Sequence, residues 1–254
     1  MESDVTLVVG VGEVGGALAE VLERKYRVVR LDLPPVEVRA PVRVMHICFP
    51  FASPTKFHSA AQSYIRRFQP ELTIINSTIP PGTTRALAKA TGTAIAHSPV
   101  RGKHARMAQE LLRYTKFISG LDQATNRLAQ EHFNAVGMKT RLVNQPESLE
   151  LAKLAETTYF GVIIAFAQAL NRWARAADAD YDDVTSFFEE IDFLPRAKYF
   201  PGFIGGHCVI PNIDLLLQLG SSDLLEAVLK SNDLRAAELG VESDAGRRRV
   251  IGEN

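Results

Sequence analysis

Several classes of protein are excluded by what this sequence has little of. Only two cysteines occur in 254 residues, so no disulfide framework is expected and a reducing compartment is favoured. The 29 Lys and Arg residues are balanced by 29 Asp and Glu residues. The basic excess typical of nucleic-acid binding is therefore missing, and no nucleic-acid partner is expected.

Long apolar runs and a basic leader are also missing. No apolar run approaches the roughly 20 residues that a membrane span needs. The chain begins with Met1-Glu2-Ser3-Asp4 and continues directly into a predicted strand, without the basic segment of a signal peptide. These absences predict a cytoplasmic protein with no membrane partner. The 46% hydrophobic content is enough for one large domain or two modest ones.

Short β-branched runs alternate with helical patterns up to residue 143, which predicts a parallel sheet covered on both faces. Strands are expected at residues 5–9, 27–31, 42–49, 72–75, 93–97, 116–119 and 140–143. From Pro146 to Ala177 no strand signal remains, and the apolar spacing predicts one long helix. Shorter helices are expected at 181–190, 214–219 and 223–239. We predict a sheet domain over 1–143, a helical catalytic and dimerisation domain over 144–241, and a flexible tail over 242–254.

A glycine-rich turn follows the first predicted strand and opens the first predicted helix. Its residues are Gly10-Val11-Gly12-Glu13-Val14-Gly15, which match G-x-G-x-x-G. In this context the motif predicts a Rossmann dinucleotide site, with the pyrophosphate at the helix N-terminus. Asp32 ends the second strand, where a carboxylate binds the ribose hydroxyls and repels a 2′-phosphate, which favours NAD. The fold class is α/β: a doubly wound parallel sheet, then an all-helical domain with one long central helix.

Four further segments resemble the UDP-glucose/GDP-mannose dehydrogenase family, in the same order and with similar spacing. They are Asn76-Ser77-Thr78-Ile79-Pro80-Pro81-Gly82-Thr83-Thr84, His97-Ser98-Pro99, Glu150-Leu151-Ala152-Lys153-Leu154-Ala155-Glu156 and Pro201-Gly202-Phe203-Ile204-Gly205-Gly206-His207-Cys208. The last segment is similar to the one that carries the family's catalytic cysteine. The resemblance spans about residues 5–240 and ends before the family's C-terminal nucleotide-sugar-binding domain, which this chain is expected to lack.

The resemblance implies roles for individual residues. Cys208 would be the nucleophile that traps an aldehyde as a thiohemiacetal, and Lys153 would stabilise an alkoxide-like transition state. Thr78 and its neighbour Ser77 would lie beside the nicotinamide, and Phe49 and Pro50 would line the cofactor. The substrate would be a small molecule, such as a sugar or sugar nucleotide. No metal site is expected, and Cys48 is expected to be buried and inert.

The sequence also departs from the family's pattern. Val100 stands where the family has a glutamate, and His104 is a candidate base in its place. Thr157 replaces the family's helix asparagine, and Asn212 replaces the aspartate four residues after the cysteine. These positions assist water attack in the family, so the second oxidation is in question.

Two other interpretations stay open. One is a β-hydroxyacid-dehydrogenase-like enzyme that uses Lys153 without covalent catalysis. The other is a degenerate NAD-binding protein that regulates a partner. Under every interpretation, Tyr159, Phe166 and Trp173 are expected in the core or in a homodimer interface along the 146–177 helix. His46 and His132 belong to no motif.

Overall fold

The computed structural model describes residues 4–32, 37–102, 106–189, 191–192, 199–206 and 208–241. It forms two compact units, Met1–Lys153 and Leu154–Asn254, which we call the sheet unit and the helical unit. The sequence predicts the domain boundary at residues 143–144, just before the long helix. The compact units instead divide after Lys153, inside that helix. The predicted tail over 242–254 lies outside the described residues.

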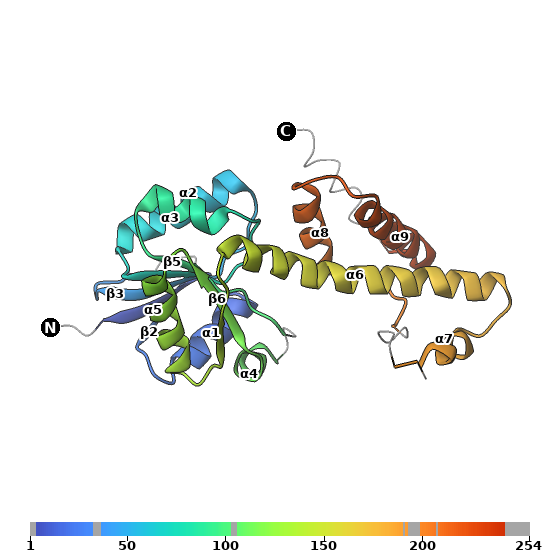
Figure 1. The fold of residues 1–254 in the computed structure, drawn as a ribbon, viewed down its shortest axis with the longest axis horizontal. Coiled ribbons are helices and arrows are strands. Elements are labelled where there is room, and N and C mark those ends of the chain that lie inside the picture. Colours follow the sequence, from blue (N-terminus) through green and yellow to red (C-terminus); the bar gives the residue numbers. More distant parts are fainter. Residues whose placement is uncertain are drawn as a thin grey trace. The chain divides into compact units, whose positions relative to one another are not determined.

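The sheet unit alternates strands and helices (Figure 1). Its elements are β1 (Val5–Val9), α1 (Glu13–Leu22), β2 (Val28–Leu31), β3 (Val42–Ile47), α2 (Pro54–Phe68), β4 (Leu72–Ile75), α3 (Thr83–Thr91), β5 (Ile95–His97), α4 (Met107–Arg113), β6 (Lys116–Gly120), α5 (Gln123–Asn134) and β7 (Thr140–Leu142). The strand order is β2-β1-β3-β4-β5-β6-β7. The predicted doubly wound sheet is therefore confirmed.

One strand pair corrects the expectation of a wholly parallel sheet. β5 and β6 pair antiparallel, with Ala96 opposite Gly120, while the other neighbouring strands pair parallel. Alternation of strands and helices does not encode strand direction, and antiparallel strands on otherwise parallel sheets are common in doubly wound folds. The sequence analysis also missed α4, a short helix that packs against α1.

Helices bury both faces of the sheet. Val8 packs into one core with Leu18 of α1, and α4 and α5 contribute to that same core. Leu7, the preceding residue of β1, packs into a second core with Phe57 of α2. Because successive strand residues point to opposite faces, this arrangement explains why β1 is apolar along its whole length.

The helical unit contains the remaining helices. They are the greater part of α6 (Pro146–Ala176), α7 (Tyr181–Glu189), α8 (Val209–Leu217) and α9 (Asp223–Leu239). The long helix agrees closely with its predicted bounds. The helix expected at 214–219 instead begins at Val209, because Pro211 falls in its first turn, where proline is tolerated.

The core of the helical unit lies where α6, α8 and α9 meet. Ala165, Ile213 and Val228 are buried there, one from each helix. A Cβ on Gly161 of α6 would lie 2.7 Å from Cγ1 of Val209. Glycine at this position therefore permits the close approach of α6 and α8.

A buried carboxylate joins the start of α6 to the rest of the sheet unit. Glu150 is fully buried and accepts hydrogen bonds from Gly82 N at 2.6 Å, Thr84 N at 2.8 Å and Thr84 Oγ1 at 2.6 Å. These donors belong to the N-terminus of α3, whose N-cap residue Gly82 has no side chain to supply a cap. Burial raises the pKa of Glu150, and the hydrogen bonds oppose that shift. Glu150 thus caps α3 from a distant helix.

We expect Glu150→Ala to lower the free energy of unfolding by about 2 to 3 kcal/mol, because it leaves buried donors without an acceptor. Urea unfolding of the variant measures this loss. Glu147→Ala is the matched control on the same helix, since its ion pair with Arg85 at 2.6 Å is open to solvent. Equal losses in the two variants would contradict the capping role of Glu150.

Candidate functional site

The glycine loop follows the carboxyl end of β1. Gly10 has a φ of +87°, and a Cβ there would lie 2.7 Å from the backbone N of Phe49. Gly15 is equally constrained, because its Cβ would lie 1.8 Å from the carbonyl oxygen of Gly10. A side chain at either position would force the loop away from its neighbours.

The middle glycine of the motif has open space instead of close neighbours. A Cβ on Gly12 would meet nothing within 4 Å. Gly12 is the N-cap of α1 and provides no side-chain cap, and Glu13 and Val14 form the first turn of that helix. Open space beside a helix N-terminus is where a pyrophosphate binds in this kind of loop. The loop therefore fits a dinucleotide.

Asp32 lies directly after β2 and contacts the glycine loop. Its Oδ2 accepts a hydrogen bond from the backbone N of Val11 at 2.8 Å. Arg30, two residues earlier and on the same side of the strand, pairs with Glu23 at 2.9 Å, so its guanidinium is directed to another partner. Of these two charged residues at the end of β2, Asp32 contacts the glycine loop, whereas Arg30 contacts Glu23.

The loops after β3 and β4 meet at the same edge of the sheet. Ser77 is buried, and its Oγ donates to the carbonyl oxygens of Phe49 at 2.6 Å and Ile47 at 3.3 Å. Thr78 and Pro50 follow in these two loops, Thr78 half-buried and Pro50 exposed. The carboxyl edge of a parallel sheet is the usual ligand-binding edge of this fold. The structure therefore gathers all the predicted cofactor residues at one edge of the sheet unit.

His97 and Lys153 lie in the same unit. His97 is fully buried at the end of β5, and its Nε2 lies 3.2 Å from the carbonyl oxygen of Ser77. Burial lowers the pKa of His97 to about 3, and the charges of Lys116 and Lys153 contribute to the shift. Lys153, in α6, is half-buried. His97 is therefore neutral at physiological pH. His104, the candidate base, lies outside the described residues.

In the helical unit, Cys208 occupies the N-cap position of α8 and is half-buried. Gly206, with a φ of +79°, makes the turn that precedes it. Asn212 is buried in the next turn of the helix, and its Nδ2 donates to Oγ1 of Thr157 at 2.6 Å. Two of the positions that depart from the family's pattern are therefore joined by a hydrogen bond.

The segment before Cys208 is fixed by a buried amide. Asn232 of α9 accepts from Ile204 N at 2.7 Å and donates to Ile204 O at 3.1 Å. Nε2 of Gln168 donates to the carbonyl oxygen of Gly202 at 2.7 Å. These bonds hold the chain leading to Cys208 against α6 and α9. The sequence analysis did not single out either amide, because buried amides carry no spacing signal.

Both cysteines are half-buried, so Cys48 is less deeply buried than the sequence analysis expects. Burial raises the pKa of the Cys48 thiol to about 12, and the nearby Lys116 charge and a hydrogen bond with Asn76 oppose the shift. A thiol with this pKa is almost wholly protonated at neutral pH and reacts poorly. The structure thus supports an inert Cys48.

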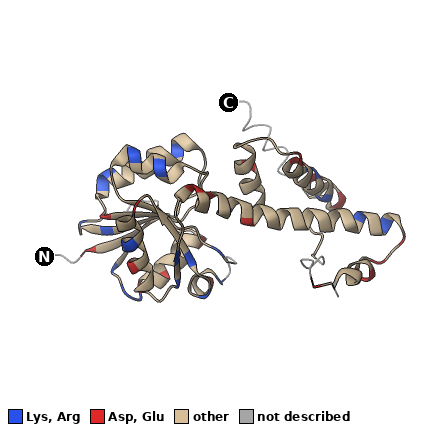
Figure 2. Ribbon diagram, viewed as in Figure 1, with Lys and Arg blue, Asp and Glu red and all other residues tan. Residues whose placement is uncertain are grey.

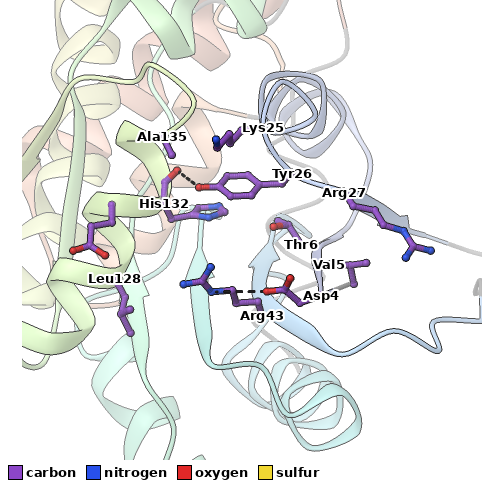
Figure 3. A pocket seen from close by; sticks show the side chains of 11 residues that line it. Asp4, Val5, Thr6, Lys25, Tyr26, Arg27, Arg43, Leu128, His132 and Ala135 are labelled. Atoms are coloured by element: carbon purple, nitrogen blue, oxygen red, sulfur yellow. Dashed lines mark hydrogen bonds and ion pairs between the residues drawn. The ribbon is translucent and has the colours of Figure 1, made fainter. Parts of the chain in front are cut away.

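Two cavities of the sheet unit lie away from the glycine loop. One, of about 320 Å³, opens at the amino ends of β1, β2 and β3, where Tyr26 and His132 stack 4.5 Å apart and Arg43 approaches Asp4 (Figure 3). The other, of about 440 Å³, lies beside Asp122 and Asn144. Neither is lined by a predicted cofactor residue. The glycine loop, at the opposite edge from the first cavity, remains the candidate site on chemical grounds.

Comparison with known proteins identifies a family model and relatives that match parts of the chain. Residues 147–234 match the family model described as "UDP-glucose/GDP-mannose dehydrogenase family, central domain". A UDP-N-acetyl-D-mannosamine dehydrogenase of Methanocaldococcus jannaschii is 32% identical over 145 residues, which cover 54% of this chain. The matched region spans only 33% of that relative's length. The resemblance seen in the sequence motifs is thus confirmed.

Solved structures show the same fold. A UDP-D-ManNAc dehydrogenase of Pyrococcus horikoshii has a TM-score of 0.79 and 21% identity, covering 92% of this chain and 70% of that one. A 3-hydroxyisobutyrate dehydrogenase of Mycobacterium tuberculosis has a TM-score of 0.69 and 15% identity, covering 94% of each chain. The arrangement of a Rossmann sheet followed by helices is therefore shared with both kinds of dehydrogenase.

Proposed function

We propose that this chain is an NAD-dependent dehydrogenase, because residues 147–234 match the model of the central domain of the UDP-glucose/GDP-mannose dehydrogenase family. It oxidises an alcohol group, and a sugar or sugar nucleotide is the proposed substrate. The observation that carries the proposal is the position of Cys208. This thiol is partly open to solvent at the N-terminus of α8, directly after a glycine turn.

NAD is the proposed cofactor, and it supplies the acceptor for hydride. The open space at Gly12 and the uncapped N-terminus of α1 suit its pyrophosphate. The carboxylate of Asp32 suits the two hydroxyls of the adenosine ribose and repels a phosphate on the 2′ position. Ser77, Thr78, Phe49 and Pro50 line the remainder of the cofactor in this proposal.

The proposed chemistry uses two side chains of the central helices. The Lys153 ammonium stabilises the alkoxide character that develops on the substrate oxygen as hydride leaves its carbon. The Cys208 thiolate then adds to the resulting aldehyde, and the carbonyl oxygen takes up a proton to give a thiohemiacetal. Loss of a second hydride from that carbon to a second NAD, with the hydroxyl proton passing to solvent, gives a thioester, which water cleaves to a carboxylate and the regenerated thiol.

The departures from the family's pattern bear on the last step. Val100 cannot act as a base, and the Asn212 amide, which donates to Thr157, cannot replace a carboxylate. We propose that hydrolysis of the thioester is slow, so the chain releases an aldehyde or accumulates the acyl-enzyme. His104 remains the proposed alternative base. Under the second interpretation, Lys153 assists a single oxidation and Cys208 takes no part.

We also propose that the chain forms a homodimer in the cytoplasm. The chain has only two cysteines, which suits a reducing compartment. Between Glu156 and Arg172, α6 has no charged residue (Figure 2). Nevertheless, among the described residues, no helix has the length and hydropathy of a membrane span.

Tyr159, Phe166 and Trp173 are 55%, 47% and 61% exposed in the single chain, and a second copy would cover them.

Asp32 should make the chain bind NAD at least about tenfold more tightly than NADP, because a ribose 2′-phosphate would face its carboxylate. Calorimetric titration with each dinucleotide measures the preference. Asp32→Ala should reduce it, whereas Arg30→Ala, on the same strand end, should leave it unchanged. Equal affinities of the original chain for NAD and NADP would contradict the role of Asp32.

The homodimer predicts a mass of twice the single-chain value of 28.0 kDa in light scattering. Trp173→Asp should shift the protein toward monomer, because it places a charge in the proposed interface. Leu121→Asp is the control, since this residue of the sheet unit is 38% exposed and lies outside α6. A monomeric original chain at micromolar concentration would contradict the proposal.

Cys208 should react with iodoacetamide much faster than Cys48, whose raised pKa leaves little thiolate. Incubation with NAD and candidate sugar nucleotides should then give a mass increase on Cys208, or a free aldehyde. Cys208→Ser should abolish the adduct, and Cys48→Ser should retain it. If Cys208 is unreactive and carries no adduct while the substrate is still oxidised, the covalent mechanism is wrong and the hydroxyacid-type interpretation replaces it.

A further inference from the structure

A buried polar cluster lies beneath the cofactor edge of the sheet unit. It consists of His46 on β3, Asn76 after β4, Lys116 at the start of β6 and His132 on α5. Their exposed fractions are 0%, 2%, 4% and 6%. None of these four side chains has a role in the proposed chemistry. Polar groups that are buried at such depth need a complete set of partners.

Lys116 is the charged member of this cluster. Its Nζ donates to Ser98 O at 2.7 Å, Pro99 O at 3.1 Å and Asn76 Oδ1 at 3.3 Å. These three acceptors match the three donors of an ammonium group. Nζ also lies 5.3 Å from the centre of the Phe133 ring. Among the described residues, no carboxylate forms an ion pair with Lys116.

The ammonium fixes the direction of the hydrogen bonds beyond it. Lys116 can only donate, so Oδ1 of Asn76 faces it, and Nδ2 of Asn76 donates to Nδ1 of His46 at 3.0 Å. Burial lowers the pKa of both imidazoles, that of His132 to about 4, so both are neutral at pH 7. His46 therefore has its proton on Nε2 and donates to Nε2 of His132, 2.9 Å away. This series of hydrogen bonds ends at His132, which lines the cavity at the amino ends of the strands (Figure 3).

The acceptors of Lys116 belong to the loops that hold the proposed cofactor residues. Asn76 is the first residue after β4 and precedes Ser77, which itself donates to Phe49 O. Ser98 and Pro99 are the first residues after β5. A single ammonium thus joins the loops after β4 and β5, and through Ser77 it reaches the loop after β3. Loops that are fixed in this way do not have to be ordered when a ligand binds.

We propose that Lys116 is a positioning residue that clamps the loops after β4 and β5 and thereby increases the affinity of the chain for the dinucleotide. The affinity effect rests on the proposed NAD binding, whereas the clamp itself does not. A neutral amine has one donor fewer than an ammonium, so loss of the proton weakens the clamp. The clamp is therefore strongest at acidic to neutral pH.

Burial lowers the pKa of Lys116 to about 7, so its charge changes close to neutral pH. Several titratable groups act on it or on its neighbours. They are Cys48, His46, His97, Arg101 and Lys153. Cys48 raises the pKa of Lys116, and Lys153 and Arg101 lower it. His46 and His97 are neutral across this range, since burial lowers the pKa of each well below neutral pH.

The stability of the fold responds to this titration with a defined sign. Unfolded Lys116 has a pKa of about 10.4, above its value of about 7 in the folded chain. Between these values the unfolded chain binds more protons, so the free energy of unfolding should rise with pH relative to a variant without this amine. Below pH 7, the buried Lys116 ammonium therefore lowers the free energy of unfolding. Such a cost in stability is common at functional sites.

The test compares the original chain with Lys116→Met, and uses Lys89→Met, an exposed lysine on α3, as the matched control. NAD binding is measured by calorimetry at about pH 6 and about pH 8.5, on either side of the pKa. The original chain and Lys89→Met should lose about tenfold in affinity at the higher pH, the effect of one charge-assisted hydrogen bond. Lys116→Met should bind NAD weakly at both pH values. If Lys116→Met binds NAD as tightly as the original chain at both pH values, the proposal is wrong.

Two further measurements do not depend on NAD binding. Amide hydrogen exchange at residues 76–79 and 98–101, corrected for its intrinsic pH dependence, should be faster in Lys116→Met than in the original chain. Asn76→Asp places a carboxylate beside the ammonium and should move the pH-dependent change in exchange to higher pH. If the original chain binds no NAD at any pH, the proposed cofactor is wrong, and loop exchange alone decides on the clamp. Unchanged exchange in both variants would overturn it.

Discussion

The arrangement of the sheet unit depends on how closely the backbone after β1 approaches the backbone after β3. Gly10 and Gly15 permit that approach, because a Cβ at either position would overlap main-chain atoms of Phe49 or of Gly10 itself. Once the loop takes this path, the first turn of α1 points its N–H groups toward open space beside Gly12. The same path brings Val11 N to the Asp32 carboxylate, so the positions proposed for the phosphates and for the ribose are set together.

Features that rest on local pattern could be predicted from the sequence. The long helix agrees with its predicted bounds because a continuous apolar periodicity has no competing strand signal. The glycine loop and Asp32 are recognisable because their spacing follows directly from the strand–turn–helix path. Cys208 is singled out by the resemblance of residues 201–208 to the family's cysteine segment, and its role stays a prediction. These are all short-range relationships, in which sequence separation and spatial arrangement are tightly linked.

Features that rest on long-range contacts could not be predicted in this way. The direction of β6 depends on tertiary packing, and no residue within it specifies that direction. Glu150 and Lys116 act on backbone groups 66 and 18 residues away, so neither has a recognisable spacing. His46 and His132 are 86 residues apart in the sequence and acquire partners only when β3 and α5 pack together. Burial and partnership of polar groups are thus properties of the fold.

The hydrogen bond between Asn212 and Thr157 has a consequence for how this protein can diverge. Nδ2 of Asn212 donates to Oγ1 of Thr157, whose own proton is directed to Leu154 O at 3.1 Å. An aspartate at 212 would have no N–H to donate, and the threonine hydroxyl would have to turn from α6 to meet it. Residues in one hydrogen-bond network contribute non-additively to stability. The two positions therefore form an epistatic pair, in which the tolerated residue at one depends on the identity of the other.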